Sequence, residues 1–172
     1  SDNDGLAMDM KRRQLEGLRI IDMTRVLAGP LAPQMLGDLG AEVIKVEHPA
    51  LGDEARFFGP PFFDPDAPQD ELESAIYLCA NRNKKGITID FAKAEGQELL
   101  RALIAKSDVL IENYRVGTLA KYRLDYESLR AINPGLIYCS VTGYGQTGPS
   151  AKRSGYDAIF QAEGGLMHSI GY

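Results

Sequence analysis

The sequence contains few of the residues that bind metals or form disulfides. It has two histidines, His48 and His168, and two cysteines, Cys79 and Cys139, among 172 residues. No cysteine or histidine stands at the spacing of a metal-ligand pair, so we expect no metal site. Both cysteines have apolar neighbours in the chain, which predicts two buried thiols in a reducing compartment.

Positive charge and long apolar runs are also scarce. The chain has 19 lysines and arginines against 24 acidic residues, a net charge of −5. This balance argues against broad nucleic-acid binding, which needs basic surface to neutralise phosphates. No apolar run reaches the roughly 18–20 residues that cross a membrane, and no segment is typical of a secretory signal. We therefore expect no nucleic-acid or membrane partner and a cytoplasmic location, or the mitochondrial matrix if the source is eukaryotic.

Length and composition fit one folded domain. The 172 residues fall in the range of roughly 100–200 that is typical of single domains. Residues 1–14 have the composition of an expression tag or a disordered lead-in. We expect the fold to occupy residues 15–172.

Short apolar runs alternate with helical patterns, which predicts an α/β fold with a mostly parallel sheet and flanking helices. The predicted strands are 18–23, 42–46, 86–90, 108–112 and 136–141, the last of them buried. A helix is predicted from Pro30, with its apolar face made by Leu31, Met35, Leu36 and Leu39. The other predicted helices are 74–80, 93–106 (apolar face Leu99, Leu100, Leu103 and Ile104), 117–122 and 126–132. Residues 49–69 show neither the helical nor the strand periodicity of apolar residues, which predicts a long loop.

The unusual residues follow the predicted strands. Ligands of open α/β sheets bind at the carboxyl ends of the strands, where this chain has residues 24–30, His48, residues 113–115 and the glycine-rich run 142–149. Neither a dinucleotide fingerprint nor a Walker A motif is present, which weighs against NAD and ATP. Four cations lie near the ends of predicted elements, where they could bind phosphate: Lys84, Lys121, Lys152 and Arg153. Their spacing alone, however, favours the interpretation that they are ordinary surface residues.

Three motifs together resemble the family III CoA-transferases, the CaiB/BaiF group that includes formyl-CoA transferases and α-methylacyl-CoA racemases. They are Asn81–Lys85, Glu112–Tyr114 and the run from Thr142 through Gly155-Tyr156-Asp157. The resemblance covers nearly the whole chain from Leu15. It implies the Rossmann-like front portion of the large CoA-binding domain of an enzyme more than twice as long.

The resemblance also implies a CoA-binding surface. CoA or acyl-CoA is then a substrate, with no covalently bound cofactor. The backbone of the loop after the first strand would meet the ligand, and a side chain at the end of the second strand would pack near the adenine. The residues that match the family's binding positions are Val26, Leu27, His48, Lys84, Asn113, Tyr114, Thr118, Lys121, Tyr122 and Lys152 or Arg153.

The implied chemistry moves CoA from an acyl-CoA to an acceptor carboxylic acid through an aspartyl anhydride. The family's nucleophilic aspartate lies beyond Tyr172, and neither Asp22 nor Asp157 matches it. Likeness to succinyl-CoA-dependent members suggests a dicarboxylate acceptor, and Leu27 replaces the glutamine of formyl-CoA transferases. Tyr156 stands where racemases carry a histidine, which weakens that alternative.

At most, Tyr156 and Asp157 would lie near the thioester. The family forms interlocked homodimers, so the remainder of the enzyme would be needed to complete this one. Two other interpretations stay open at this point. One is a non-catalytic module that binds CoA or a partner, and the other is a truncation product that binds nothing.

Overall fold

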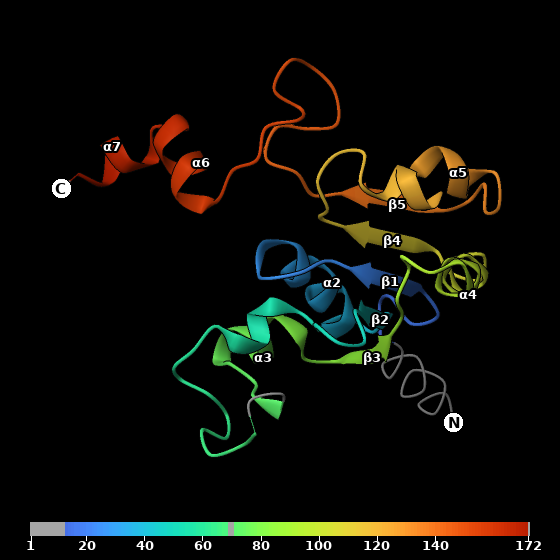
Figure 1. Cartoon of the computed structure of the whole chain (residues 1–172), viewed down its shortest axis with the longest axis horizontal. Coiled ribbons are helices and arrows are strands. Elements are labelled where there is room, and N and C mark those ends of the chain that lie inside the picture. The colour runs from blue at the N-terminus through green and yellow to red at the C-terminus, as the bar shows by residue number, and fades with distance from the viewer. Residues whose placement is uncertain (1–12, 69–70, 172) are drawn as a thin grey trace, which may run out of the picture.

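The computed structural model describes residues 13–68 and 71–171. Its centre is a five-stranded sheet in which all neighbouring strands run parallel, in the order β3-β2-β1-β4-β5 (Figure 1). The strands are β1 Arg19–Met23, β2 Glu42–Glu47, β3 Lys84–Thr88, β4 Val109–Glu112 and β5 Ile137–Ser140. This confirms the predicted α/β class. The strand order reverses between β1 and β4, which places the expected ligand cleft at their carboxyl ends.

Helices cover both faces of the sheet. They are α2 Ala28–Asp38, α3 Ala75–Asn81, α4 Ala94–Ile104 and α5 Tyr126–Arg130, with 3₁₀ turns η1 Glu54–Phe57 and η3 Leu119–Tyr122. Two further helices, α6 Asp157–Glu163 and α7 Leu166–Ile170, lie apart from the sheet (Figure 1). The larger core lies under α4, η3 and α5, where Leu100 and Ile104 pack with Ile21 of β1. The smaller core packs Ile20 of β1 near α2. Successive residues of β1 thus enter opposite cores, as pleating requires.

Helix α2 buries a different face from the one predicted. Leu31, Met35 and Leu39 are exposed, Met35 by 63%, and only Leu36 of the predicted face packs against the smaller core. The buried residues are Gly29, Pro30, Pro33, Gln34 and Gly37. The helix approaches its neighbours so closely that a Cβ on Gly29 would lie 2.7 Å from the Thr24 Cβ. Small residues therefore form the contact, and the large apolar residues face away.

The last strand and both cysteines are more exposed than predicted. β5 is an edge strand, since no strand among the described residues pairs with its outer side, and Ile137 is 64% exposed. Cys139 on this strand and Cys79 on α3 are both free and exposed. In α3 the residues that face inward are Tyr77 and Ala80, so the helix turns Cys79 outward. The prediction of buried thiols was wrong for both cysteines.

Other boundaries shift by a few residues. β3 begins at Lys84, two residues before the predicted start at Gly86. Residues 117–122 form a turn followed by η3 rather than an α-helix, and the predicted loop 49–69 contains η1. Of the predicted lead-in, residues 1–12 lie outside the described part, while the Arg13 carbonyl accepts a hydrogen bond from the Glu16 N–H. Among the described residues, no helix has both the length and the apolarity needed to cross a membrane.

The two neighbouring leucines of α4 provide a test of this packing. Leu100 is fully buried, whereas Leu99 is 59% exposed. Leu100→Ala should lower the free energy of unfolding by about 2–5 kcal/mol because it leaves a cavity in the larger core, whereas Leu99→Ala should change it by less than about 0.5 kcal/mol. Equilibrium urea unfolding of the two variants measures both values. Equal losses would contradict the orientation of α4.

Candidate functional site

The loops that follow β1 and β4 are joined across the point where the strand order reverses. The Arg25 N–H donates to the Asn113 Oδ1 at 2.9 Å, and the Asn113 Nδ2 donates back to the Arg25 carbonyl at 2.8 Å. One side-chain amide therefore satisfies both backbone groups of Arg25. Asn113, predicted as a ligand contact, serves in this structure to hold the loop after β1.

Lys84 lies in a buried ion pair and not at the surface. Its Nζ donates to the Asp22 Oδ2 at 2.7 Å, to the Pro30 carbonyl at 2.8 Å and to the Asn81 Oδ1 at 2.9 Å. The side chain is 2% exposed, and burial lowers the pKa of this ammonium although Asp22 acts against the shift. All three of its donors are used, so the CoA contact that the resemblance implies for Lys84 does not fit this geometry.

A cleft of about 160 Å³ opens beside the loop after β1. The Arg25 guanidinium lies over the Tyr114 ring, 4.9 Å from its centroid. The His48 Nδ1 accepts the backbone N–H groups of Ala50 and Leu51 at 3.1 and 3.2 Å, and its Nε2 lies 3.8 Å from the Asp90 Oδ1. The structure thus brings two predicted residues, His48 and Tyr114, to one cleft. Its lining consists of Arg25, Val46, Glu47, His48, Leu51, Gly52, Asp53, Phe91 and Tyr114.

Of the predicted residues in the turn after β4, Tyr114 lines this cleft and Tyr122 contacts it through Phe91. The Phe91 ring stands edge-on to both Tyr114 and Tyr122, with centroid distances of 5.6 and 5.3 Å. The Tyr122 ring therefore supports the wall of the cleft through Phe91. Thr118 is half-buried, and its carbonyl accepts the N–H of the exposed Lys121 at 3.3 Å. Direct contacts from Thr118, Lys121 and Tyr122 to a ligand stay predictions.

The predicted residues after β5 do not reach the cleft. The segment that ends in α6 and α7 lies apart from the sheet (Figure 1). Within it, Arg153 pairs with Glu163 and lies over the Tyr144 ring at 4.6 Å. Lys152 and Asp157 are exposed, and Tyr156 is 84% exposed.

The glycine-rich run also has a local role. A Cβ on either Gly143 or Gly155 would overlap the Phe160 ring. Close packing on Phe160 therefore accounts for these two glycines, and no ligand is needed to explain them.

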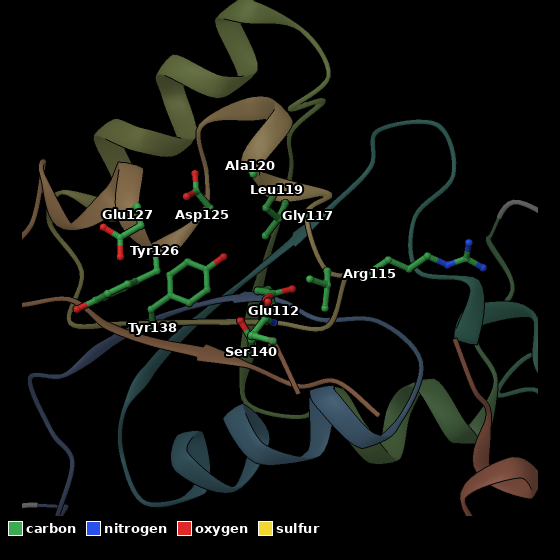
Figure 2. Close-up of a pocket in the computed structure, with 12 residues that line it drawn as sticks. Glu112, Arg115, Gly117, Leu119, Ala120, Asp125, Tyr126, Glu127, Tyr138 and Ser140 are labelled. Atoms are coloured by element: carbon green, nitrogen blue, oxygen red, sulfur yellow. The ribbon is translucent and has the colours of Figure 1, made fainter. Parts of the chain in front are cut away.

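A second, larger cavity of about 600 Å³ lies between the ends of β4 and β5 and the η3–α5 region. Figure 2 shows Glu112 and Ser140 beside each other at its floor, with Tyr126 and Tyr138 along one side and Arg115 extending away. The Glu112 Oε2 accepts the Tyr114 N–H at 2.8 Å. Burial raises the pKa of the Glu112 carboxyl above its ordinary value.

Sequence patterns did not single out several of these residues. Arg25 lies in the segment 24–30 and Glu112 in a motif, both already noted, although neither residue was predicted as a contact. Asp53 and Phe91 carry no such signal, since neither stands in a recognisable motif. Within residues 13–68 and 71–171, no group of three or more His, Cys, Asp or Glu side chains could hold a metal ion.

Residues 15–172 match the family model of CoA-transferase family III. The chain belongs to this family. It is 52% identical, over 95% of its length, to the succinate–glutarate CoA-transferase of Agrobacterium fabrum, and 51% identical over 92% to the human succinyl-CoA:glutarate CoA-transferase. It is 46% identical over 92% to the alpha subunit of the Chloroflexus aurantiacus succinyl-CoA–L-malate CoA-transferase. The chain spans 41%, 35% and 36% of these three relatives.

A solved structure supports the same assignment. A CaiB/BaiF family protein from Brucella suis superposes with a TM-score of 0.85 at 53% identity, over 91% of this chain and 40% of that one. The resemblance inferred from the three motifs is therefore confirmed, and the family III fold includes the parallel sheet described above.

The buried ion pair of Lys84 gives a first test of the site. Lys84→Met should lower the free energy of unfolding by about 3–5 kcal/mol, because it leaves the Asp22 carboxylate buried without its partner. The control is Lys85→Met, since Lys85 pairs with Glu42 at the surface and its loss should cost less than about 1 kcal/mol. Urea unfolding compares the two. A small loss for Lys84→Met would show that its ammonium is not held by Asp22.

Glu112 predicts a pH dependence of stability. Its raised pKa in the folded protein means that the native state holds a proton which the unfolded chain releases, so wild-type stability falls as pH rises from the unfolded to the folded pKa. Glu112→Gln keeps an acceptor for Tyr114 and removes the charge. It should therefore raise the melting temperature at pH 8 and change it little below about pH 4. A gain that is independent of pH would contradict this assignment.

Proposed function

We propose that the protein carrying this chain transfers CoA from an acyl-CoA to a dicarboxylic acid, and that this chain holds the nucleotide end of CoA. The observation that carries the proposal is 52% identity over 95% of the chain to a succinate–glutarate CoA-transferase. Relatives named for glutarate and for L-malate both match more than nine tenths of the chain. The named acceptors differ while the match stays high, so the matched part suits CoA, which both enzymes handle, better than one particular acceptor.

The cleft beside the loop after β1 supports this role. Its volume of about 160 Å³ is well below the roughly 300–1,000 Å³ of sites that enclose a drug-sized ligand. It thus suits one portion of CoA, for which the adenine ring is the best match. The Phe91 and Tyr114 rings offer aromatic surface, and Arg25 brings a cation that can meet a phosphate.

The proposed reaction needs a carboxylate from outside this chain. That carboxylate attacks the acyl-CoA thioester, which forms an acyl anhydride and releases CoA thiolate. The thiolate then attacks the enzyme's carbonyl, which releases the donor acid and leaves an enzyme thioester. The acceptor carboxylate attacks this thioester, giving a second anhydride and CoA thiolate, and the thiolate then attacks the acceptor's carbonyl, which forms the new acyl-CoA and restores the enzyme carboxylate. Asp22 is unsuited to this role because it is fully buried and bonded to both Thr24 and Lys84. Asp157 lies in the segment that stands apart from the sheet.

The rest of the proposal follows from family membership. Tyr156 provides no imidazole to exchange a proton, so we propose CoA transfer, and not racemisation, as the activity. We also propose that the complete protein works as a homodimer inside the cell.

The substrate class is tested with the full-length protein and succinyl-CoA as donor. We expect CoA transfer to glutarate or L-malate with kcat/KM at least about tenfold above that for acetate and formate, because a site built for a second carboxylate leaves its polar groups unpaired with a monocarboxylate. Chromatographic detection of the new acyl-CoA measures each rate. Activity with monocarboxylates alone would refute the dicarboxylate proposal, and CoA binding without any transfer would point to the non-catalytic alternative.

A further inference from the structure

Val26, in the loop after β1, has an unusual backbone conformation. Its φ is 71°, in the left-handed region, which is shared among the described non-glycine residues only with Asn83 and Arg123. This conformation costs an L-residue about 1–2 kcal/mol, and a β-branched side chain is especially unsuited to it. Such a geometry persists only where surrounding contacts impose it, and it is concentrated at functional sites.

The contact that imposes it comes from Asp53, 27 residues further along the chain. The Asp53 Oδ1 accepts the N–H of Val26 at 3.1 Å and that of Ala55 at 3.0 Å. The Asp53 N–H donates to the Glu47 Oε2 at 2.8 Å. The carboxylate is fully buried and is fixed from its own turn as well as from β2.

Lys45 completes the arrangement. Its Nζ donates to the Asp53 Oδ2 and to the Thr24 carbonyl, both at 2.9 Å, and its side chain is only 2% exposed. Lys45 therefore holds the residue before Arg25, and Asp53 holds the residue after it. With both neighbours fixed, the Arg25 side chain is directed over Tyr114 in the cleft.

We infer that Asp53, held by Lys45, is a positioning residue that sets the loop after β1, and with it Arg25, for CoA binding. This inference rests on the proposed function. A buried ion pair is often no more stabilising than an apolar pair of similar size, so stability alone gives no reason for these charges. The carboxylate does what an apolar side chain cannot, since it accepts a backbone N–H from a residue in a strained conformation.

The experiment compares three substitutions in the full-length protein. Asp53→Ala removes every acceptor, whereas Asp53→Asn keeps an Oδ1 for Val26 but loses the charge opposite Lys45. Glu42→Gln is the control, because Glu42 lies on the same strand as Lys45 but at its amino end, where it pairs with Arg19 and Lys85. Calorimetric titration with CoA gives Kd, hydrogen exchange of the peptide covering residues 24–28 reports on the loop, and thermal unfolding gives the stability of each variant.

We expect Asp53→Ala to weaken CoA binding on the order of tenfold or more, since small displacements of positioning groups have effects of this size, and to speed exchange at Val26. Asp53→Asn should bind CoA distinctly better than Asp53→Ala although both lose the ion pair, and Glu42→Gln should bind like the wild type. An unchanged Kd for Asp53→Ala overturns the inference. So does a Kd that merely follows the loss of stability, equal for the alanine and asparagine variants.

Two further outcomes separate this inference from the proposed function. Wild-type protein that binds CoA without transferring it refutes the proposed reaction, and the Kd comparison still decides the role of Asp53. Wild-type protein that does not bind CoA overturns both. Should Asp53→Ala fail to fold, Asp53→Glu decides, because it keeps the charge beside Lys45 but moves the carboxylate away from Val26. Wild-type affinity in that variant overturns the inference.

Discussion

Two buried lysine–aspartate pairs beneath the carboxyl edge of the sheet are the constraint on which the site depends. Asp22 pairs with Lys84 at 2.7 Å and Lys45 with Asp53 at 2.9 Å, and all four side chains are at most 2% exposed. Removing such charges from water is costly unless every polar atom finds a partner, and among the described residues no buried side-chain nitrogen or oxygen lacks one. The pairs tie β1, β2, β3 and the turn at Asp53 together, so the loop after β1 cannot move independently of the sheet.

The fold class was predictable because it depends on local patterns. Strands covered on both faces appear as continuous apolar runs, and their alternation with helices requires a parallel sheet. The buried face of α2 was not predictable in the same way. Periodicity gives weight to large apolar residues such as Met35, whereas this helix packs through Gly29 and Gly37. Close backbone approach is set by tertiary contacts, to which a hydrophobic pattern is insensitive.

The same distinction applies to the site. His48 and Tyr114 were predictable because parallel strands deliver their carboxyl ends to one edge. Asp53 was not, since it lies in a stretch without periodicity and reaches the loop through Val26, which is 27 residues away in the sequence. Lys84 was assigned to CoA binding because it matches the lysine of the family's Asn-Lys pair. In sequence, a lysine that faces solvent looks the same as one that faces a buried carboxylate. Only the position of Asp22 distinguishes the two cases.

The glycine-rich run shows why a motif can identify a family while its physical cause lies elsewhere. The run follows the last predicted strand, and it is one of the three motifs that carry the resemblance to the family. In this structure Gly143 and Gly155 make room for the Phe160 ring, and Tyr144 packs edge-on against that ring at 5.5 Å. Arg153, also in this segment, is occupied by Glu163 and Tyr144. The residues that shape the cleft are therefore those around Asp53, whereas Gly143 and Gly155 of the motif pack against α6 and Gln146 lines the larger cavity.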